Sequence, residues 1–300
     1  MKNRSIHACS LILLCFSWLT SPANAQSQPA SKSSHHSLWK IQGAKSTVYL
    51  LGSVHLLKQE DYPLPAVMEA AFTNSQIAVF EADVGQMSEP ETQAKMMSKA
   101  QLPDGETLRQ HLTPETYAAF SERVGKAGLP PAMFDTFKPL LAVSLLEMTE
   151  LQKMGCDPRY GLDEHFFAEA KKSGKQIIPL ETVDFQIDLF TGFSKEDSES
   201  IMKAELKDID NTQKDFADII QSWREGDTAK LEKLLHSAMI ESPVVFKKML
   251  TDRNKKWAPR IEELARGSIN AIVIVGAGHL VGKDGVVELL KKKGLKITQE

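Results

Sequence analysis

Two histidines in this sequence follow short apolar runs that end in glycine. The run at 48–51 leads into the segment GSVH, which ends at His55, and the run at 272–275 leads into GAGH, which ends at His279. Uninterrupted apolar runs of this length are typical of strands buried on both faces. In open α/β sheets, ligands bind outside the carboxyl ends of the strands, and imidazole both binds metals and titrates near neutral pH. We therefore expect the fold to bring His55 and His279 together.

Carboxylates follow two further predicted strands. The apolar run at 77–80 ends in Glu81, and the run at 176–180 ends in Glu181. Glu81 could complete a metal site with the two histidines or act as a general base, and we expect Glu181 to contact the substrate or to support a ligand. If the first strand continues, Asp83 points to the same side as Glu81. The alternative for each acid is a solvated strand end or a helix N-cap.

An arginine near the start of a predicted helix is a further candidate. Arg253 could stabilise a developing negative charge, although a surface salt bridge fits the sequence equally well. The alternative for His55 and His279 is a helix cap or a hydrogen bond to a carbonyl group. Asp163 and His165 lie on a predicted helix, where we expect a structural role rather than metal ligation.

The composition is that of a globular protein, and it excludes several functions. The chain has 300 residues, of which 42% are apolar and 25% charged, with a formal net charge of −3. There is no basic stripe, so nucleic acid is not an expected partner. The third glycine of a dinucleotide fingerprint is displaced to Gly282, and the sequence contains no H-E-x-x-H, G-x-S-x-G or P-loop motif.

The N-terminus has the pattern of a secretory signal peptide over residues 1–25. Lys2 and Arg4 precede an apolar run at 8–19, and Ala23-Asn24-Ala25 is a small-x-small cleavage site. We expect an exported protein, periplasmic or secreted, with no stable membrane span after cleavage; an uncleaved anchor is the alternative. Cleavage would leave Cys156 as the single cysteine, without a disulfide partner. Residues 26–37 are rich in Ser, Gln and His and are predicted to be a disordered linker.

Strand patterns occur near both ends of the chain, and helical patterns fill the middle. We therefore predict an α/β fold, leaning to α+β, with one domain over 38–300. Its mixed β-sheet is built from the N- and C-terminal parts, and a large helical middle region, at about 88–155 and 194–252, caps the carboxyl edge of the strands. The individual elements are predicted as strands at 38–41, 47–51, 77–80, 176–180, 270–275 and 295–297, and as helices at 63–75, 89–100, 114–127, 139–154, 163–173, 194–266 and 286–290.

An ordered set of short motifs resembles the TraB/GumN family. The motifs span nearly all of the chain after residue 37: LWKI leading to GSVH, then FEAD, GLDEHF, LETVDFQ, RN and GAGHLVG. The family is similar to the Tiki proteins, which are membrane-tethered metalloproteases, and more distantly to erythromycin esterases and ChaN proteins. Unlike Tiki, this sequence shows no carboxy-terminal membrane anchor.

The resemblance implies an exported metal-dependent hydrolase of the peptidase type. It implies a metal centre of His55, Glu81 and His279 holding Mn²⁺, Co²⁺ or Zn²⁺, and catalytic roles for Glu81, Glu181 and Arg253. The expected partner is a peptide or a small ester-like substrate. Two alternatives stay open: a non-catalytic protein that binds or sequesters peptides, and a metal-free esterase in which His55 is the general base.

Overall fold

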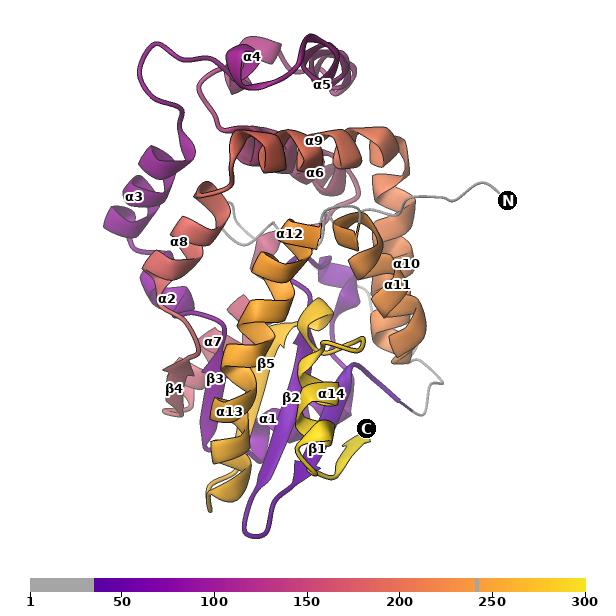
Figure 1. The fold of residues 1–300 in the computed structure, drawn as a ribbon. Coiled ribbons are helices and arrows are strands. Elements are labelled where there is room, and N and C mark those ends of the chain that lie inside the picture. The colour runs from indigo at the N-terminus through magenta and orange to yellow at the C-terminus, as the bar shows by residue number, and fades with distance from the viewer. Residues whose placement is uncertain (1–34, 241–242) are drawn as a thin grey trace.

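The computed structural model describes residues 35–240 and 243–300, and its centre is a six-stranded sheet (Figure 1). The strand order is β4-β3-β5-β2-β1-β6. The strands are β1 (Leu38–Gln42), β2 (Thr47–Ser53), β3 (Ile77–Phe80), β4 (Gln176–Pro179), β5 (Ala271–Gly276) and β6 (Ile297–Gln299). The predicted α/β fold, with one sheet built from both ends of the chain, is confirmed.

Four neighbouring strands of this sheet run parallel to one another. Strand β5 lies in the middle and pairs in parallel with β2 and β3, and β3 pairs in parallel with β4, whereas β1 is antiparallel to both β2 and β6. All six residues of β5 are buried, as its β-branched run predicts. Because parallel strands end at the same edge of a sheet, the residues that follow β2, β3, β4 and β5 are brought to one rim.

Helices cover both faces of the sheet. Figure 1 shows α1 (Ala66–Thr73) and α7 (Leu162–Lys172) behind it and α13 (Asp252–Arg266) and α14 (Val286–Lys292) in front. Helix α13 carries Trp257, Ile261 and Ala265 at intervals of four residues, and all three are buried. This spacing places them on one face of the helix, which packs against the sheet.

The helical middle has a hydrophobic core of its own. Phe120, Val124, Leu146 and Met202 are each fully or almost fully buried within it. Figure 1 shows α6, α8, α9 and α12 stacked beyond the edge of the sheet at which β5 ends. The helices of this part and its flanks are α2 (Val84–Met87), α3 (Pro90–Ala100), α4 (Leu108–His111), α5 (Pro114–Lys126), α6 (Pro139–Lys153), α8 (Val183–Thr191), α9 (Lys195–Asp208), α10 (Thr212–Glu225), α11 (Thr228–Ile240) and α12 (Pro243–Phe246). We call these helices the cap; the predicted large helical middle is confirmed.

Two helices begin directly after strands at the rim. Strand β3 ends at Phe80, as its apolar run predicts, and Asp83 is a helix N-cap, the alternative left open for it: its side chain accepts a hydrogen bond of 3.0 Å from the Gln86 N–H at the start of α2. After β4 the chain enters α8, which the sequence analysis does not predict. The Thr182 hydroxyl accepts from the Phe185 N–H at 3.1 Å, so an N-cap starts this helix directly after Glu181.

The start of the described chain is packed against the domain. The side chain of Ser37 is buried and donates to the Trp223 carbonyl at 3.0 Å, and the His36 N–H donates to the Glu300 carbonyl at 2.6 Å. The predicted disorder therefore does not reach Ser37. The predicted signal peptide, 1–25, and residues 26–34 of the linker lie outside the described residues. Within the described ranges, no helix combines the length and apolar character needed to cross a bilayer.

Candidate active site

The four parallel strands deliver the predicted site residues to one place. His55 follows β2, Glu81 follows β3, Glu181 follows β4, and His279 ends the short 3₁₀ turn η7 (Ala277–His279) after β5. A Cβ atom placed on Gly276 would lie 3.6 Å from His55 Nε2, 3.6 Å from His279 Cδ2 and 3.3 Å from Glu81 Oε1. Because both atoms lie 3.6 Å from the same point, His55 Nε2 and His279 Cδ2 are at most 2 × 3.6 Å apart. The structure brings the two histidines together.

His55 is held by a carboxylate on α7. Its Nδ1 lies 2.5 Å from Asp163 Oδ2, and the Ser53 hydroxyl donates to the same oxygen. A carboxylate accepts, so Nδ1 carries the proton and Nε2 is left facing Gly276. Burial alone would lower the pKa of His55, but the charge and hydrogen bond of Asp163, together with Glu81, raise it above its ordinary value.

The approach of α7 to His55 depends on a glycine. A Cβ atom on Gly161, the N-cap of α7, would lie 2.3 Å from the His55 carbonyl oxygen, which is a clash with backbone. The Leu162 N–H also donates to the Val54 carbonyl at 3.1 Å. These contacts fix the first turn of α7, so Asp163 is placed directly beside His55.

Arg253 lies inside the protein, so the surface salt bridge considered from the sequence is wrong. The residue is 2% exposed. Its Nη2 donates to Glu81 Oε2 at 2.5 Å and to Glu181 Oε2 at 2.8 Å, and its Nε donates to Glu181 Oε1 at 2.9 Å. A π-helical segment, η6 (Lys247–Thr251), precedes α13, and Arg253 Nη1 donates to the Met249 carbonyl there at 3.2 Å. A buried cation requires such pairing, and two carboxylates supply it.

His279 is a neutral imidazole with a defined tautomer. The Asn254 amide donates from Nδ2 to the Asp284 carbonyl at 2.9 Å, so its oxygen faces His279 Nδ1 at 2.6 Å and accepts from it. The remaining nitrogen, Nε2, accepts from Arg253 Nη1 at 3.1 Å. Burial, Arg253 and nearby histidines hold the pKa of His279 well below its usual value. The Trp257 ring packs against the imidazole with centroids 4.4 Å apart.

Glu81 links the arginine to the end of β5. Its Oε1 accepts from the Gly276 N–H at 2.7 Å, and its Oε2 accepts from Arg253. Burial by itself would raise the pKa of Glu81, but the positive charge of Arg253, with His55 and the backbone hydrogen bond, lowers it. Glu81 is therefore ionised and fixed in orientation.

The donor atoms of the predicted metal centre are only partly open in this arrangement. His55 Nε2 has an open lone pair, but His279 Nε2 and Glu81 Oε2 both accept from Arg253. Among the residues that the structure describes, no group of three or more His, Cys, Asp or Glu side chains is arranged to hold a metal ion. As arranged here, the residues do not fit a three-ligand centre, because Arg253 would first have to release two of the ligands. The metal centre stays a prediction.

Sequence reasoning missed three residues of this centre. Asp163 was expected to have only a structural role, but its carboxylate orients His55. His165, on the same helix, contacts Glu69 at 3.3 Å and not the centre. Asn254 fixes the tautomer of His279, and Gln186 donates to Glu181 at 3.2 Å. One signal was in the sequence: Arg253 stands four residues before Trp257, so a helix that buries Trp257 also turns Arg253 inward.

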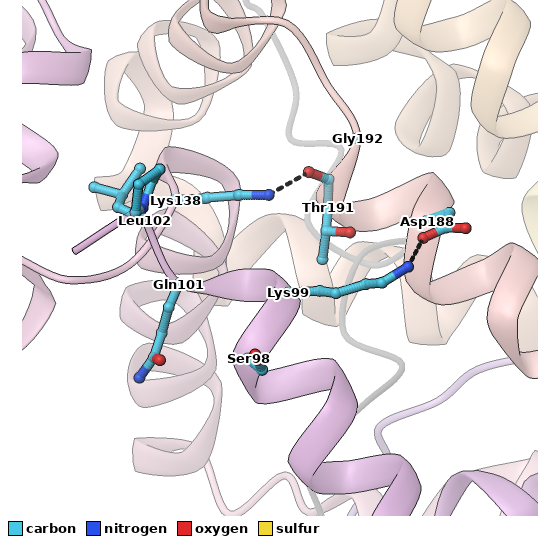
Figure 2. A pocket seen from close by; sticks show the side chains of 9 residues that line it. Ser98, Lys99, Gln101, Leu102, Lys138, Asp188, Thr191 and Gly192 are labelled. Carbon is cyan, nitrogen blue, oxygen red and sulfur yellow. Dashed lines mark hydrogen bonds and ion pairs between the residues drawn. The ribbon is translucent and has the colours of Figure 1, made fainter. Parts of the chain in front are cut away.

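A separate hollow of about 540 Å³ lies in the cap, between the end of α3, the start of α6 and the end of α8 (Figure 2). Lys138 Nζ donates to the Thr191 carbonyl at 2.9 Å, and Lys99 pairs with Asp188. None of its lining residues belongs to the predicted site. Both lysines are engaged by groups of the hollow itself, so the hollow offers no unpaired lysine to a ligand.

The fold and the site together define an α/β protein with a buried centre of histidine, carboxylate and arginine at the carboxyl edge of parallel strands, under a helical cap. The chain belongs to the TraB/PrgY/gumN family, whose sequence pattern matches residues 37–299. It is 23% identical over 244 residues to uncharacterized protein YbaP of Escherichia coli, covering 81% of this chain and 87% of that protein. The YbaP protein of Shigella flexneri is similar to the same extent. No solved structure matches the chain significantly.

Proposed function

We propose that this protein is a hydrolase in which His55 is the general base that activates water. The observation that carries the proposal is the 2.5 Å contact between His55 Nδ1 and Asp163, which leaves Nε2 facing the buried centre of Glu81, Arg253 and His279. A base oriented by a carboxylate, next to a positive charge, is the arrangement that hydrolysis of an acyl group needs.

The proposed reaction uses four side chains. His55 Nε2 removes a proton from water as the water oxygen attacks the carbonyl carbon of a peptide or a small ester-like substrate. Arg253 exchanges its Nη1 hydrogen bond to His279 for one to the oxygen of the anionic intermediate, and Glu81 and Glu181 hold the guanidinium in place. Protonated His55 then gives its proton to the leaving group as the bond to the carbonyl carbon breaks. Burial by itself would lower the pKa of His55, but Asp163 raises it, which makes Nε2 a stronger base than an ordinary imidazole.

The centre must open for a substrate to enter. His55 is 8% exposed, Glu81 4% and His279 1%, so a substrate reaches them only when the surrounding elements move. When the site closes again over a bound substrate, water is excluded from the reaction and the electrostatic contacts inside the site become stronger.

A metal-dependent hydrolase is the second candidate. It is favoured by the convergence of His55, Glu81 and His279 around Gly276. Only if Arg253 released His279 and Glu81 would these three residues hold Mn²⁺, Co²⁺ or Zn²⁺, and the ion would then supply an activated water. The contact of Arg253 with His279 and Glu81 weighs against this candidate in the present arrangement.

One experiment separates the two candidates. The protein is purified without a histidine tag, its metal content is measured, and hydrolysis of p-nitrophenyl esters and of a peptide library is assayed with and without a chelator. We expect chelator-resistant turnover that His55→Ala abolishes and that the control His165→Ala keeps. Stoichiometric metal and chelator-sensitive turnover, both lost in His55→Ala and His279→Ala, would favour the metal centre instead. Unchanged turnover in His55→Ala would refute both.

Two further expectations are proposals as well. The protein could bind and sequester peptides without turnover, and stoichiometric capture without product would indicate that role. We also propose that the protein is exported, on the pattern of residues 1–25. Mass spectrometry of the protein purified from its natural host should then find a mature N-terminus at Gln26, and an intact N-terminus in a cytoplasmic fraction would contradict export.

A further inference from the structure

A buried amide next to the active centre has an unused hydrogen-bond acceptor. Gln186, on α8, is 1% exposed. Its Nε2 donates to Glu181 Oε2 at 3.2 Å and lies 3.5 Å from Glu81 Oε2. Its Oε1 is buried and has no hydrogen-bond partner among the residues that the structure describes.

The orientation of this amide follows from its neighbours. Carboxylates are acceptors, so the NH₂ group of Gln186 must face Glu81 and Glu181, and the opposite orientation would place oxygen against oxygen. The unpartnered atom is therefore the oxygen. In a planar amide the oxygen lies about 2.3 Å from the nitrogen, so Gln186 Oε1 is within about 6 Å of Glu81 Oε2. The acceptor therefore lies next to the carboxylates that pair with Arg253.

A buried acceptor without a partner destabilises the folded protein, because the group has lost its hydrogen bond to water. Native proteins contain few such groups, and those that persist call for a specific explanation such as a binding role. A ligand that brings an N–H to this position removes the penalty. An ester has an oxygen without a hydrogen where an amide has its N–H, so a bound ester leaves Gln186 Oε1 without a hydrogen bond.

We propose that Gln186 Oε1 accepts a hydrogen bond from an amide N–H of the substrate, and that the site therefore selects peptide-like amides over esters. This inference rests on the hydrolase proposed above and adds a specificity-determining residue to it. Sites built around a buried polar group discriminate strongly against ligands that leave the group unpaired. Arg253 acts on the carbonyl oxygen, which amides and esters share, and His55 gives its proton to either leaving group, so neither residue forms a hydrogen bond that only an amide can make.

The test compares matched substrates in Gln186→Met and wild type. Methionine keeps the length of the side chain and removes the acceptor. The substrates are N-acyl p-nitroanilides and p-nitrophenyl esters with the same acyl groups, and the readout is the amide-to-ester ratio of kcat/KM. Loss of the Nε2 contact with Glu181 affects both substrates, so it cancels in the ratio. Gln221→Met, on the exposed face of α10, is the matched control.

We expect the amide-to-ester ratio to fall about 10-fold or more in Gln186→Met and to stay constant in Gln221→Met. If His55-dependent turnover persists and the ratio does not change, the inference is wrong and the hydrolase stands. If wild type hydrolyses neither substrate, the hydrolase fails, and ligand binding decides the inference. N-acetyl amino-acid methylamides should then raise the Tm of wild type more than the matching methyl esters, and Gln186→Met should lose this preference; equal shifts, or none, would overturn it.

Discussion

Replacing Asp163 with Asn tests how the buried histidine works. The substitution keeps the shape of the side chain but removes the charge that lies 2.5 Å from His55 Nδ1. It also weakens the partner of the Ser53 hydroxyl. General-base catalysis contributes about 10²–10⁴-fold to a rate, and most of that depends on the correct tautomer and basicity of the imidazole. We therefore expect kcat/KM to fall by about 10²–10⁴-fold.

The pH profile gives a second readout of the same change. His55 acts as a base only when Nε2 is unprotonated, so kcat/KM should rise with pH through the pKa of His55. Asp163 raises that pKa above the ordinary 6.5, so the wild-type midpoint lies above 6.5. Loss of the charge should move the midpoint of Asp163→Asn to lower pH. Asp184→Asn, which removes a surface carboxylate paired with Lys95 at 2.6 Å, is the control and should leave the profile unchanged.

The assay is steady-state hydrolysis from pH 5 to 9 on protein whose thermal melt confirms that it is folded, with and without added Mn²⁺, Co²⁺ or Zn²⁺. If Asp163 only supports a metal-bound histidine, metal affinity should fall about 10–100-fold and excess metal should restore the rate. A folded Asp163→Asn protein with wild-type kcat/KM and an unshifted midpoint would refute the role of Asp163 as the group that orients a base.

Three other predictions concern separate parts of the chain. Gly276→Ala should keep the fold, because any residue can adopt the backbone conformation of Gly276, but its methyl group lies between the two imidazoles and should lower the activity about 10²-fold or more. Gly161→Ala should instead lower the Tm, because its methyl group clashes with the backbone of His55. The reverse pattern would contradict the structure. Partial burial by itself would raise the pKa of Glu199, but hydrogen bonds from Thr113, Lys203 and Thr116 lower it from 4.5 to about 2. The ionised carboxylate therefore stabilises the folded protein above pH 4.5, and this stabilisation is lost as the pH falls towards 2. Glu199→Gln should cost about 1–2 kcal/mol at pH 7 and little at pH 2 in urea unfolding, and an equal cost at both would argue against it. Burial raises the pKa of Cys156 to about 11, so its thiol should react with a disulfide reagent far more slowly in the native protein at pH 8 than in urea, and equal rates would contradict its burial.

Much of the fold could be predicted from local patterns. The apolar runs at 48–51, 77–80 and 272–275 are strands in the structure, and glycine and proline mark most of the element boundaries. Helix α8 was not predicted, because its start depends on one cap at Thr182 rather than on a long periodic pattern. The end of β3 at Phe80 was predicted, and of the alternatives left open for Asp83 the structure shows the helix N-cap, because its carboxylate caps α2.

The sequence also predicted which side chains meet. Strand–helix–strand order makes strands parallel, parallel strands end at one edge, and His55, Glu81, Glu181 and His279 each follow such a strand. That inference needs only the chain order and the period of the apolar residues. It does not need the identity of any partner, which is why it could be made from one sequence.

The partners themselves were decided only in the tertiary structure. Asp163 is separated from His55 by 108 residues and Arg253 from Glu81 by 172, so no local pattern couples them. The spacing to Trp257 places Arg253 on the buried face of its helix, but the carboxylates that it pairs with depend on how α13 packs against the sheet. Burial decides the chemistry of these residues, because a charge that is shielded from water needs a partner inside the protein. These partners determine the tautomer of His279 and the basicity of His55, and they leave the oxygen of Gln186 without a hydrogen bond.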